Sequence, residues 1–360
     1  MKGINNFMEL QKLIYSASEE QPIWFKLLSS FGVVFFWLGI SLRSILFDLG
    51  LRKKKYLPSF CVSVGNIVLG GTGKTPVIIA MLRYLFAHSV KPVVLSRGYG
   101  ASLKKSEYLV IKNGKIIFSN EEKSHKIPDE SMLLSKTFPQ LVIIAGAQRY
   151  KAAQQFLGNS GEHFDMWILD DGFQHRCIHR DLDIVLLDAK RPFGNNSLIP
   201  RGTLRELEFS LKRAHCIFWT RSGQDLPHLG LFEEVQKRYQ KQVFKIPFTP
   251  SGFFNPIKNC DIEVCEVPDK VFVVTGIAVP DRLLEDIKSF GKEVVDTYIV
   301  SDHQSFSRKI IQEKITYSDC IVTSAKDYWR DEAIFADLLI PVYILKIELK
   351  FCFSRIFPSL

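Results

Sequence analysis

The sequence predicts an α/β protein in which helices cover both faces of a mainly parallel sheet. Continuous apolar stretches of strand length alternate with stretches of helical periodicity, and this alternation is typical of parallel sheets. A glycine-rich turn joins the first of these strands to the first of these helices. With 360 residues, 46% of them apolar, the chain can bury one large core or two medium ones.

Charge and cysteine content limit the class of protein. The net charge is +9 and the isoelectric point is near 9.1, which suits an anionic partner such as a nucleotide, a nucleic acid or an acidic membrane face. The seven cysteines form no C-x-x-C pair, and their number is odd. This usage favours a reducing compartment without a disulfide framework or a zinc site.

The N-terminal segment differs in character from the rest of the chain. Residues 27–42 carry no charge but are fewer than the ~20 apolar residues that a spanning helix needs. A basic cluster, Arg52 to Lys55, follows the apolar pattern, whereas a secretory signal carries its charges in front. We predict that residues 1–55 form a membrane-associating helical segment that lies in or dips into the membrane face. A single membrane span and a helix buried in a soluble core are the alternatives.

After residue 55 the expected elements follow in order. Strands are expected at Phe60–Val64, Pro92–Leu95, Leu141–Ala145, Met166–Leu169, Asp183–Leu187 and Cys216–Trp219. Helices are expected at Val77–Phe86, Ser131–Lys136, from Gln148 to about Leu157, and at Leu204–Arg213. Asn113-Gly114 predicts the turn of a hairpin between the second and third strands.

The pattern changes at Val243. Phe244–Phe248 and Ile262–Val267 are short alternating stretches that we expect to pair as an antiparallel connector. Strand and helix then alternate again, with strands at Val271–Val274, Glu293–Val300, Cys320–Thr323 and Val342–Ile347 and a helix at Pro280–Phe290. The predicted domains are a nucleotide-binding domain at 56–242, a two-stranded linker at 243–268 and a smaller α/β domain at 269–360.

The chain is organised around the stretch G-N-I-V-L-G-G-T-G-K-T, residues 65–75. The order strand, glycine loop, Lys-Thr, helix is that of a phosphate-binding P-loop. Glycines allow backbone N–H groups to approach phosphate oxygens, and the N-terminus of the following helix adds unpaired donors. Lys74 is expected to reach the β- and γ-phosphates of ATP, and the Thr75 hydroxyl to ligate Mg²⁺.

One residue departs from the full P-loop pattern. Val68 stands where G-x-x-x-x-G-K-[ST] requires a glycine, which leaves the shorter form G-G-x-G-K-T. An accidental glycine-rich turn is the alternative interpretation. The predicted nucleotide-binding residues are Val68, Leu69, Gly70, Gly71, Thr72, Gly73, Lys74 and Thr75.

A second acidic motif follows the predicted strand Met166–Leu169. Asp170 and Asp171 stand at its carboxyl end, where open α/β sheets bind their ligands. Beside a P-loop, this pair is expected to hold Mg²⁺, a hard cation that takes oxygen ligands. An ordinary turn is the alternative. Gln174 and His175 follow at the same edge and are candidates for substrate contact.

Three further positions carry residues suited to phosphoryl transfer. Asp129 follows Pro128 at a helix start, where it could cap the helix or accept a proton from an attacking hydroxyl. Asp302-His303 ends a strand of the second domain, and either is an incidental surface pair or presents a histidine oriented by a carboxylate. Arg205-Glu206 lies at a predicted helix start, where the arginine either binds phosphate or is merely solvated.

Together these stretches resemble the tetraacyldisaccharide 4'-kinase family of lipid A biosynthesis. The matching pieces are V-G-N-I-V-L-G-G-T-G-K-T-P, S-R-G-Y-G, D-E after Pro128, L-D-D-G-F-Q-H-R, the block G-N…L-I-P-R-G-T-L-R-E, T-G-I-A-x-P and D-H-Q. The resemblance implies a P-loop α/β/α sandwich with a smaller α/β/α domain joined by a two-stranded linker. It implies transfer of the γ-phosphate of ATP to the 4'-hydroxyl of a tetraacyldisaccharide 1-phosphate, with Mg²⁺.

The resemblance also implies roles for individual residues. Asp129 matches the family's catalytic aspartate and His303 its histidine partner, in different predicted domains, so that closure would assemble them. Lys74 completes the catalytic set, and Thr75, Asp170 and Asp171 are the metal ligands. The candidates for acceptor binding are Arg97, Tyr99, Arg149, Gln174, His175, Arg205 and Glu206.

The chain departs from the family pattern at three places. Ser131 replaces a proline after Asp129-Glu130, Gln304 replaces the second histidine of D-H-H, and Ala325 replaces the glutamate of T-E-K-D. The expected location is the cytoplasmic face of a Gram-negative inner membrane, with no nucleic acid and no obligate protein partner. The alternative function is a membrane-associated switch ATPase of the ParA/MinD type, which normally carries a lysine where this chain has Leu69.

Overall fold

The computed structural model describes residues 13–16, 20–120, 125–222, 229–301 and 304–358. The chain divides into two compact units. The first unit comprises Met1–Lys74, His88–Pro92 and His163–Pro247, and the second comprises Thr75–Ala87, Val93–Glu162 and Phe248–Leu360. The domain boundaries expected from the sequence stay a prediction.

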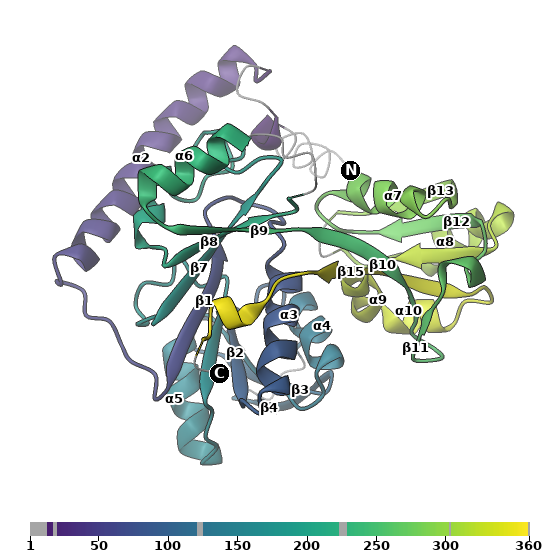
Figure 1. Ribbon diagram of the computed structural model, residues 1–360, viewed down its shortest axis with the longest axis horizontal. Coiled ribbons are helices and arrows are strands. Elements are labelled where there is room, and N and C mark those ends of the chain that lie inside the picture. Colours follow the sequence, from purple (N-terminus) through teal and green to yellow (C-terminus); the bar gives the residue numbers. More distant parts are fainter. Residues whose placement is uncertain (1–12, 17–19, 121–124, 223–228, 302–303, 359–360) are drawn as a thin grey trace. The chain divides into compact units, whose positions relative to one another are not determined.

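In the first unit, parallel strands follow one another in the order β6-β1-β7-β8-β9, of which β1, β7, β8 and β9 are labelled in Figure 1. Nearly every residue of β1, β7 and β8 is buried, so both faces of these strands are covered. The bounds are β1 Phe60–Asn66, β6 Met166–Asp170, β7 Leu182–Asp188, β8 Cys216–Thr220 and β9 Gln242–Ile246.

Helix α2 (Ile23–Asp48) packs along the first unit (Figure 1). Val33, Phe36 and Ile40 contact an apolar cluster made by β7, β8 and helix α6 (Leu229–Tyr239). The helix has 26 residues and is therefore about 39 Å long. By length and composition alone it is long and apolar enough to cross a membrane. The exposed large apolar residues of α2 are Ile23, Trp24, Leu27, Leu28, Phe31, Val34, Phe35, Trp37, Leu38, Leu42 and Ile45.

In the second unit, one group of strands has the order β4-β3-β5-β2. The hairpin of β3 and β4 turns at Asn113 and Gly114, with φ of 50° and 68°, as the sequence predicted. The strands are β2 Pro92–Ser96, β3 Tyr108–Lys112, β4 Lys115–Ser119 and β5 Val142–Gly146. The accompanying helices are α3 (Lys74–Ala87), α4 (Asp129–Thr137) and α5 (Arg149–Ser160).

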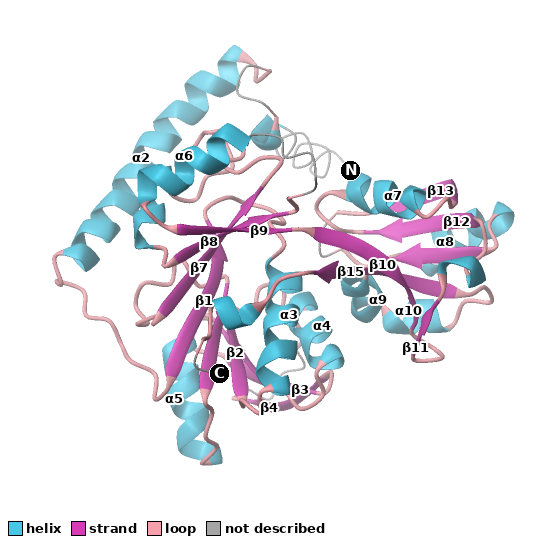
Figure 2. Cartoon of the chain, viewed as in Figure 1, coloured by secondary structure: helices cyan, strands magenta, loops and turns pink. Residues whose placement is uncertain are grey.

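The second unit also contains a mixed sheet of order β11-β10-β15-β14-β12-β13 (Figure 2). Val271 and Val273 of β12 contact residues of helix α7 (Pro280–Ser289), whereas Phe272 and Val274 contact residues of α9 (Ala325–Arg330) and α10 (Glu332–Ala336). Helices therefore cover both faces of this sheet. The strands are β10 Phe248–Asn255, β11 Cys260–Ile262, β12 Lys270–Thr275, β13 Glu293–Ile299, β14 Cys320–Thr323 and β15 Val342–Leu349.

The α/β prediction is confirmed, and three details of it are wrong. The helix expected at Leu204–Arg213 is only a 3₁₀ helix at Glu208–Arg213, because the preceding residues bond to the P-loop. The stretches expected to form a paired connector do not pair with each other: β9 joins β8, and β11 joins β10. Helix α6 was missed, and β9 begins at Gln242, before the stretch expected at Phe244–Phe248. The remaining helices are α8 Arg308–Lys314 and the 3₁₀ turns Val264–Glu266, Ile315–Tyr317 and Phe353–Arg355.

Candidate active site

The loop between β1 and α3 turns at two glycines. Gly70 and Gly73 have φ of 97° and 87°, a conformation in which other residues are strained. Val68 forms an isolated antiparallel bridge with Leu204, and the N–H of Leu69 donates to the carbonyl of Thr203 at 2.7 Å. Val68 thus belongs to a strand-like contact before the turn, and this explains why a glycine is not needed there.

The ends of neighbouring strands hold the peptide groups of this loop. The Thr220 hydroxyl donates to the carbonyl of Thr72 at 2.8 Å, and Arg221 donates to the carbonyl of Gly71 at 2.7 Å. Arg221 is itself held by Asp188 at 2.7 Å. Since N–H and C=O point in opposite directions across a trans peptide, these contacts turn the N–H groups of Thr72 and Gly73 away from β8. The loop donors are therefore oriented by the protein itself.

The acidic motif approaches the start of the P-loop closely. A side chain at Gly65 would place its Cβ 2.7 Å from the Cβ of Phe173, so only glycine allows the two segments to touch. Asp170 ends β6 and pairs in register with Val64 of β1. Asp171 follows in a left-handed conformation, with φ of 51°. This backbone turn directs the chain into the segment Gly172 to Arg176.

Asp171 is shared by two cations. Lys74 Nζ lies 3.5 Å from Asp171 Oδ1, and one guanidinium nitrogen of Arg205 lies 2.8 Å from each carboxylate oxygen. The N–H of Arg205 also donates to the carbonyl of Ile67 at 2.8 Å, which fixes the arginine beside the P-loop. The structure thus brings together Lys74, Asp171 and Arg205, which come from three separate sequence motifs.

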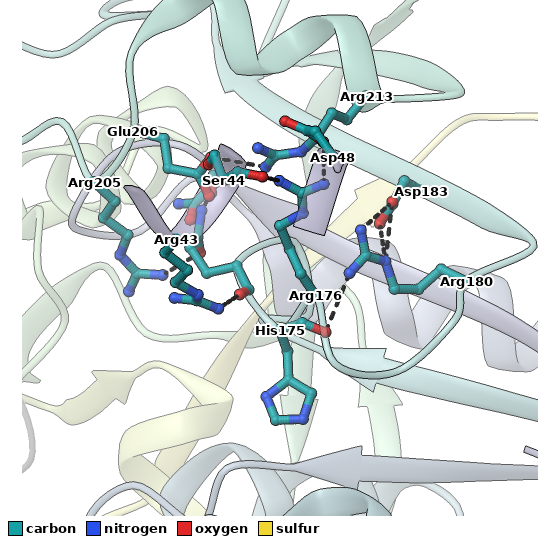
Figure 3. A network of polar contacts seen from close by, with 12 residues as sticks. Arg43, Ser44, Asp48, His175, Arg176, Arg180, Asp183, Arg205, Glu206 and Arg213 are labelled. Atoms are coloured by element: carbon teal, nitrogen blue, oxygen red, sulfur yellow. Dashed lines mark hydrogen bonds and ion pairs between the residues drawn. The ribbon is translucent and has the colours of Figure 1, made fainter. Parts of the chain in front are cut away.

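Gln174 connects this group to helix α2 through Arg43, which is labelled in Figure 3. Its side-chain amide donates to the carbonyl of Asn66 at 2.9 Å, and its amide oxygen accepts from Arg205 at 3.3 Å. The guanidinium of Arg43, on α2, donates to the backbone carbonyl of Gln174. Arg176 also binds α2, donating to the carbonyl of Ser44 at 3.2 Å and to Asp48.

Two further predicted residues, Glu206 and His175, contact neighbouring side chains in the same region. Glu206 accepts from Arg213 at 2.7 Å, and the guanidinium of Arg213 lies 4.5 Å from the ring centroid of Phe173. The Nε2 atom of His175 lies 3.0 Å from the sulfur of Cys177. Glu206 therefore supports the acidic motif through Arg213, and His175 lies on the same loop.

In the second unit, Asp129 is the first residue of α4 and only 4% exposed. The residue before the helix is Pro128, and no side chain caps α4, so the helix-cap interpretation of Asp129 is wrong. The guanidinium of Arg330, at the end of α9, lies 3.9 Å from the Asp129 carboxylate. A fully buried cation therefore stands beside the candidate base.

Arg330 is held by two other carboxylates. It lies 3.0 Å from Asp327 and donates to Asp331 at 2.9 Å, and its guanidinium stacks 4.7 Å from the ring centroid of Phe306. Asp327 in turn accepts from the Thr275 hydroxyl at 2.8 Å and from the N–H of Gly276 at 3.1 Å. The T-G-I-A-x-P and T-S-A-K-D stretches thus meet in one buried polar cluster.

The other predicted residues of the second unit lie in separate places. Arg97 and Tyr99 follow β2 and are exposed, whereas Arg149 begins α5 and is buried. Thr75 is half-buried in the first turn of α3. His303 lies outside the described residues, as does Asp302.

The sequence reasoning missed Arg43, Asp188, Arg221 and Arg330. Arg221 and Asp188 each follow or end an apolar strand at its carboxyl end, which is a usable signal in a parallel sheet. Arg330 has no local signal beyond its place three residues after Asp327 on a helix.

Comparisons with known proteins identify the group to which the chain belongs. The model of the tetraacyldisaccharide-1-P 4'-kinase family matches residues 24–357. The chain belongs to this family. The chain is 31% identical over 313 residues to the tetraacyldisaccharide 4'-kinase of Desulfotalea psychrophila, covering 84% of this chain and 87% of that one. It is 31% identical over 321 residues to that of Geobacter sulfurreducens, covering 87% and 86%.

A solved structure gives the same result for the fold. The crystal structure of LpxK from Aquifex aeolicus in complex with ATP is 26% identical, with a TM-score of 0.69, and the match covers 90% of this chain and 94% of that one. The tetraacyldisaccharide 4'-kinase match spans both the P-loop and the α9 cluster, so it does not depend on the P-loop alone. The alternative of a ParA/MinD-type switch ATPase is not favoured.

Proposed function

We propose that the protein transfers the γ-phosphate of ATP to the 4'-hydroxyl of a tetraacyldisaccharide 1-phosphate. The product of this reaction is lipid IVA, an intermediate of lipid A biosynthesis. The observation that carries the proposal is the family match over residues 24–357, whose P-loop lysine here contacts the acidic motif at 3.5 Å. The bound ATP of the Aquifex aeolicus structure supports ATP as the donor.

The P-loop residues 68–75 bind the phosphates of ATP. Backbone N–H groups already turned by Thr220 and Arg221 are suited to the β-phosphate oxygens. Lys74 stabilises charge on the transferred group, and Asp171, itself held by Arg205, keeps the Lys74 ammonium near the loop until the nucleotide arrives. Phosphoryl transfer depends mainly on such positioning and charge neutralisation.

Mg²⁺ fits the oxygen donors of Thr75, Asp170 and Asp171. Among the described residues there is no cluster of three or more His, Cys, Asp or Glu side chains that could hold a metal by itself. This agrees with a cation that is bound by one or two carboxylates and by substrate phosphates. Both oxygens of Asp171 lie within 2.8 Å of Arg205, so we assign direct ligation to Asp170 and Thr75. Bound Mg²⁺ neutralises charge on the phosphates.

Asp129 accepts the proton of the attacking sugar hydroxyl. It is buried, and the positive charge of Arg330 stands 3.9 Å from its carboxylate. His303 is proposed as its partner on the strength of the family resemblance. Arg97, Tyr99, Arg149, Gln174, His175, Arg205 and Glu206 are proposed to contact the acceptor.

Helix α2 associates with the membrane that holds the acceptor. One side of α2 packs on the first unit from Phe25 to Phe47, while the opposite side exposes large apolar residues along its length. A helix buried along one side lies more readily in the membrane surface than across it. We assign this surface to the cytoplasmic face of the inner membrane, where ATP is available.

The experiment that tests the function is an ATP-consumption assay with and without the acylated glucosamine disaccharide 1-phosphate. The kinase proposal predicts phosphate transfer to the lipid and little ATP turnover without it. Hydrolysis of ATP at the same rate in both reactions, with no phosphorylated lipid, would overturn the proposal in favour of a switch ATPase.

A further inference from the structure

Arg43 occupies an unexpected position on α2. It lies three residues after Ile40 and four before Phe47, which places it in the stripe that packs on the first unit. The other residues of that stripe are mainly apolar, including Phe25, Val33 and Phe36. The Arg43 side chain is itself exposed, so it stands where this packed stripe meets solvent.

The contacts of Arg43 differ from those of nearby arginines. Arg176, Arg205 and Arg213 each have a carboxylate within 4.0 Å. Within the described chain Arg43 has none, and its hydrogen bond goes to the backbone carbonyl of Gln174. The Arg43 guanidinium is thus fixed in position by a neutral group while its charge has no contacting counter-ion.

The residue is exposed overall, but the surrounding protein removes part of the hydration of its guanidinium. Desolvation lowers the pKa of Arg43 from its ordinary value, and the more distant Glu206 carboxylate offsets this only in part. Arginine nevertheless remains protonated in proteins. A charged guanidinium that has lost part of its hydration binds an anion more strongly than one in free solvent.

Arg43 and Arg205, both labelled in Figure 3, each donate a hydrogen bond to an oxygen of Gln174. Each uses one terminal nitrogen for its contacts with described residues, so its remaining nitrogens have no acceptor in that part of the chain. Arg205 forms an ion pair with Asp171, and Asp171 contacts the P-loop lysine. We therefore assign Arg205 to the nucleotide side of the site. Arg43, by contrast, belongs to α2, the helix that carries the exposed apolar residues.

We propose that Arg43 binds the phosphate of the acyl-sugar acceptor and so selects the 1-phosphorylated acceptor over its unphosphorylated form. The proposal rests on the proposed function, whose family name specifies a 1-phosphate on the acceptor. An amphiphile whose acyl chains lie against the apolar side of α2 carries its phosphate at the polar boundary, where the planar guanidinium can bind two oxygens. A bilayer phosphate group offers the same chemistry, and the experiment separates the two sources.

The test compares Arg43→Gln with wild type on two acceptors, the tetraacyldisaccharide 1-phosphate and its 1-hydroxyl analogue, in micelles of one neutral detergent. Wild type should prefer the phosphorylated acceptor by at least about tenfold in kcat/KM. Arg43→Gln should lose about 10- to 100-fold of kcat/KM on the phosphorylated acceptor, the value of a charge-assisted contact, and little on the analogue. Arg43→Lys should be intermediate, because lysine keeps the charge but not the planar fork.

Lys26→Gln is the matched control, because Lys26 is the other cation of α2. It should retain the preference for the phosphorylated acceptor. Relative to wild type, the two substitutions should change vesicle binding by similar amounts. This should hold for neutral vesicles and for vesicles that also contain phosphatidylglycerol. KM for ATP and the apparent Tm of Arg43→Gln should match wild type, and if this variant does not fold, Arg43→Lys carries the comparison.

Three results would overturn the inference while leaving the kinase intact. They are equal losses on the two acceptors, a change confined to KM for ATP, and a change seen only with anionic vesicles. A wild type that phosphorylates both acceptors equally well would also overturn it. Transfer to neither acceptor would overturn the proposed function, and the inference with it.

Discussion

The guanidinium of Arg330 lies 3.9 Å from the carboxylate of Asp129, and no hydrogen bond joins them. The arginine is fully buried and is oriented by Asp327 and Asp331 rather than by Asp129. Arg330 therefore places positive charge near the candidate base, Asp129, and makes no hydrogen bond to either oxygen of the Asp129 carboxylate.

Replacing Asp129 by Asn should remove the base while keeping the shape of the side chain. We expect kcat to fall by about 10²- to 10⁴-fold, the usual value of a general base, with KM for ATP nearly unchanged. Steady-state kinetics on the lipid acceptor measures both. Glu332→Gln, which removes a half-exposed partner of Lys136 in the same unit, should leave kcat within about twofold. Turnover near wild type in Asp129→Asn would exclude Asp129 from this role.

Replacing Arg330 by Met should destabilise the second unit. The substitution leaves Asp327 and Asp331 buried without their counter-ion, which costs about 3–5 kcal/mol. Arg308→Met breaks an Arg–Asp pair in the same unit whose side chains are 49% and 61% exposed, and it should cost less than about 1 kcal/mol. Urea denaturation of the two variants measures the difference. Equal midpoints would show that the Arg330 cluster is not a stabilising unit.

Replacing Arg221 by Ala should weaken ATP binding. Without this side chain the Gly71 carbonyl loses its donor, and the N–H of Thr72 is no longer held in the orientation described above. We expect KM for ATP to rise about 10- to 100-fold with a smaller change in kcat, and equilibrium binding of ATP measures the same loss. Arg238→Ala, which removes exposed ion pairs of α6 in the same unit, should leave ATP binding unchanged. A fall in kcat alone would contradict a role in orienting the loop.

Much of the fold could be predicted from local pattern, because buried parallel strands consist of continuous apolar residues. This holds for β1, β5 and β14, whose residues came almost entirely from such runs. The helix expected at Leu204–Arg213 failed because residues 203–205 bond to Ile67, Val68 and Leu69 of the P-loop. Such long-range backbone contacts leave no trace in helical periodicity.

The candidate site was predictable where one motif carries its chemistry, as in Lys74 and Asp171. Arg43 and Arg330 could not be found in this way, and Arg221 only from its place after an apolar strand, because each contacts a site residue that is far away in the sequence. Arg43 lies 131 residues from Gln174, and Arg221 lies 150 residues from Gly71. Single arginines in helices and turns are commonplace, and only the folded chain shows which of them lie beside a site.

Gly65 allows the P-loop strand and the acidic motif to touch. A methyl group at this position would lie 2.7 Å from the Cβ of Phe173 and 2.8 Å from its backbone nitrogen, closer than real contacts allow. We therefore expect Gly65→Ala to lower the apparent Tm by several degrees, because overpacking costs about 1–3 kcal/mol. Gly71→Ala meets no atom within 4 Å and should leave Tm nearly unchanged. Equal Tm values for the two variants would show that the segments can separate at no cost.

His215 should make the first unit sensitive to mild acid. Its Nδ1 accepts the backbone N–H of Asp183 at 2.8 Å, which requires an unprotonated nitrogen, and burial lowers its pKa from the ordinary value of 6.5. Between the lowered pKa and 6.5, the unfolded chain binds a proton that the folded chain does not. Stability is therefore complete above pH 6.5 and declines as the pH falls toward the folded pKa, by at most about 1.4 kcal/mol per pH unit.

His215→Asn tests this pH dependence, because the asparagine Oδ1 atom can accept the same hydrogen bond but cannot titrate. Apparent Tm measured from pH 8 to pH 5 should decline less steeply in the variant than in wild type. Above pH 7 the two proteins should differ by a constant amount, since His215 is neutral in both folded and unfolded chains. His163→Asn, which removes an exposed imidazole of the same unit, should follow the wild-type curve. Parallel curves for His215→Asn and wild type across the whole range would show that His215 does not account for the loss of stability in acid.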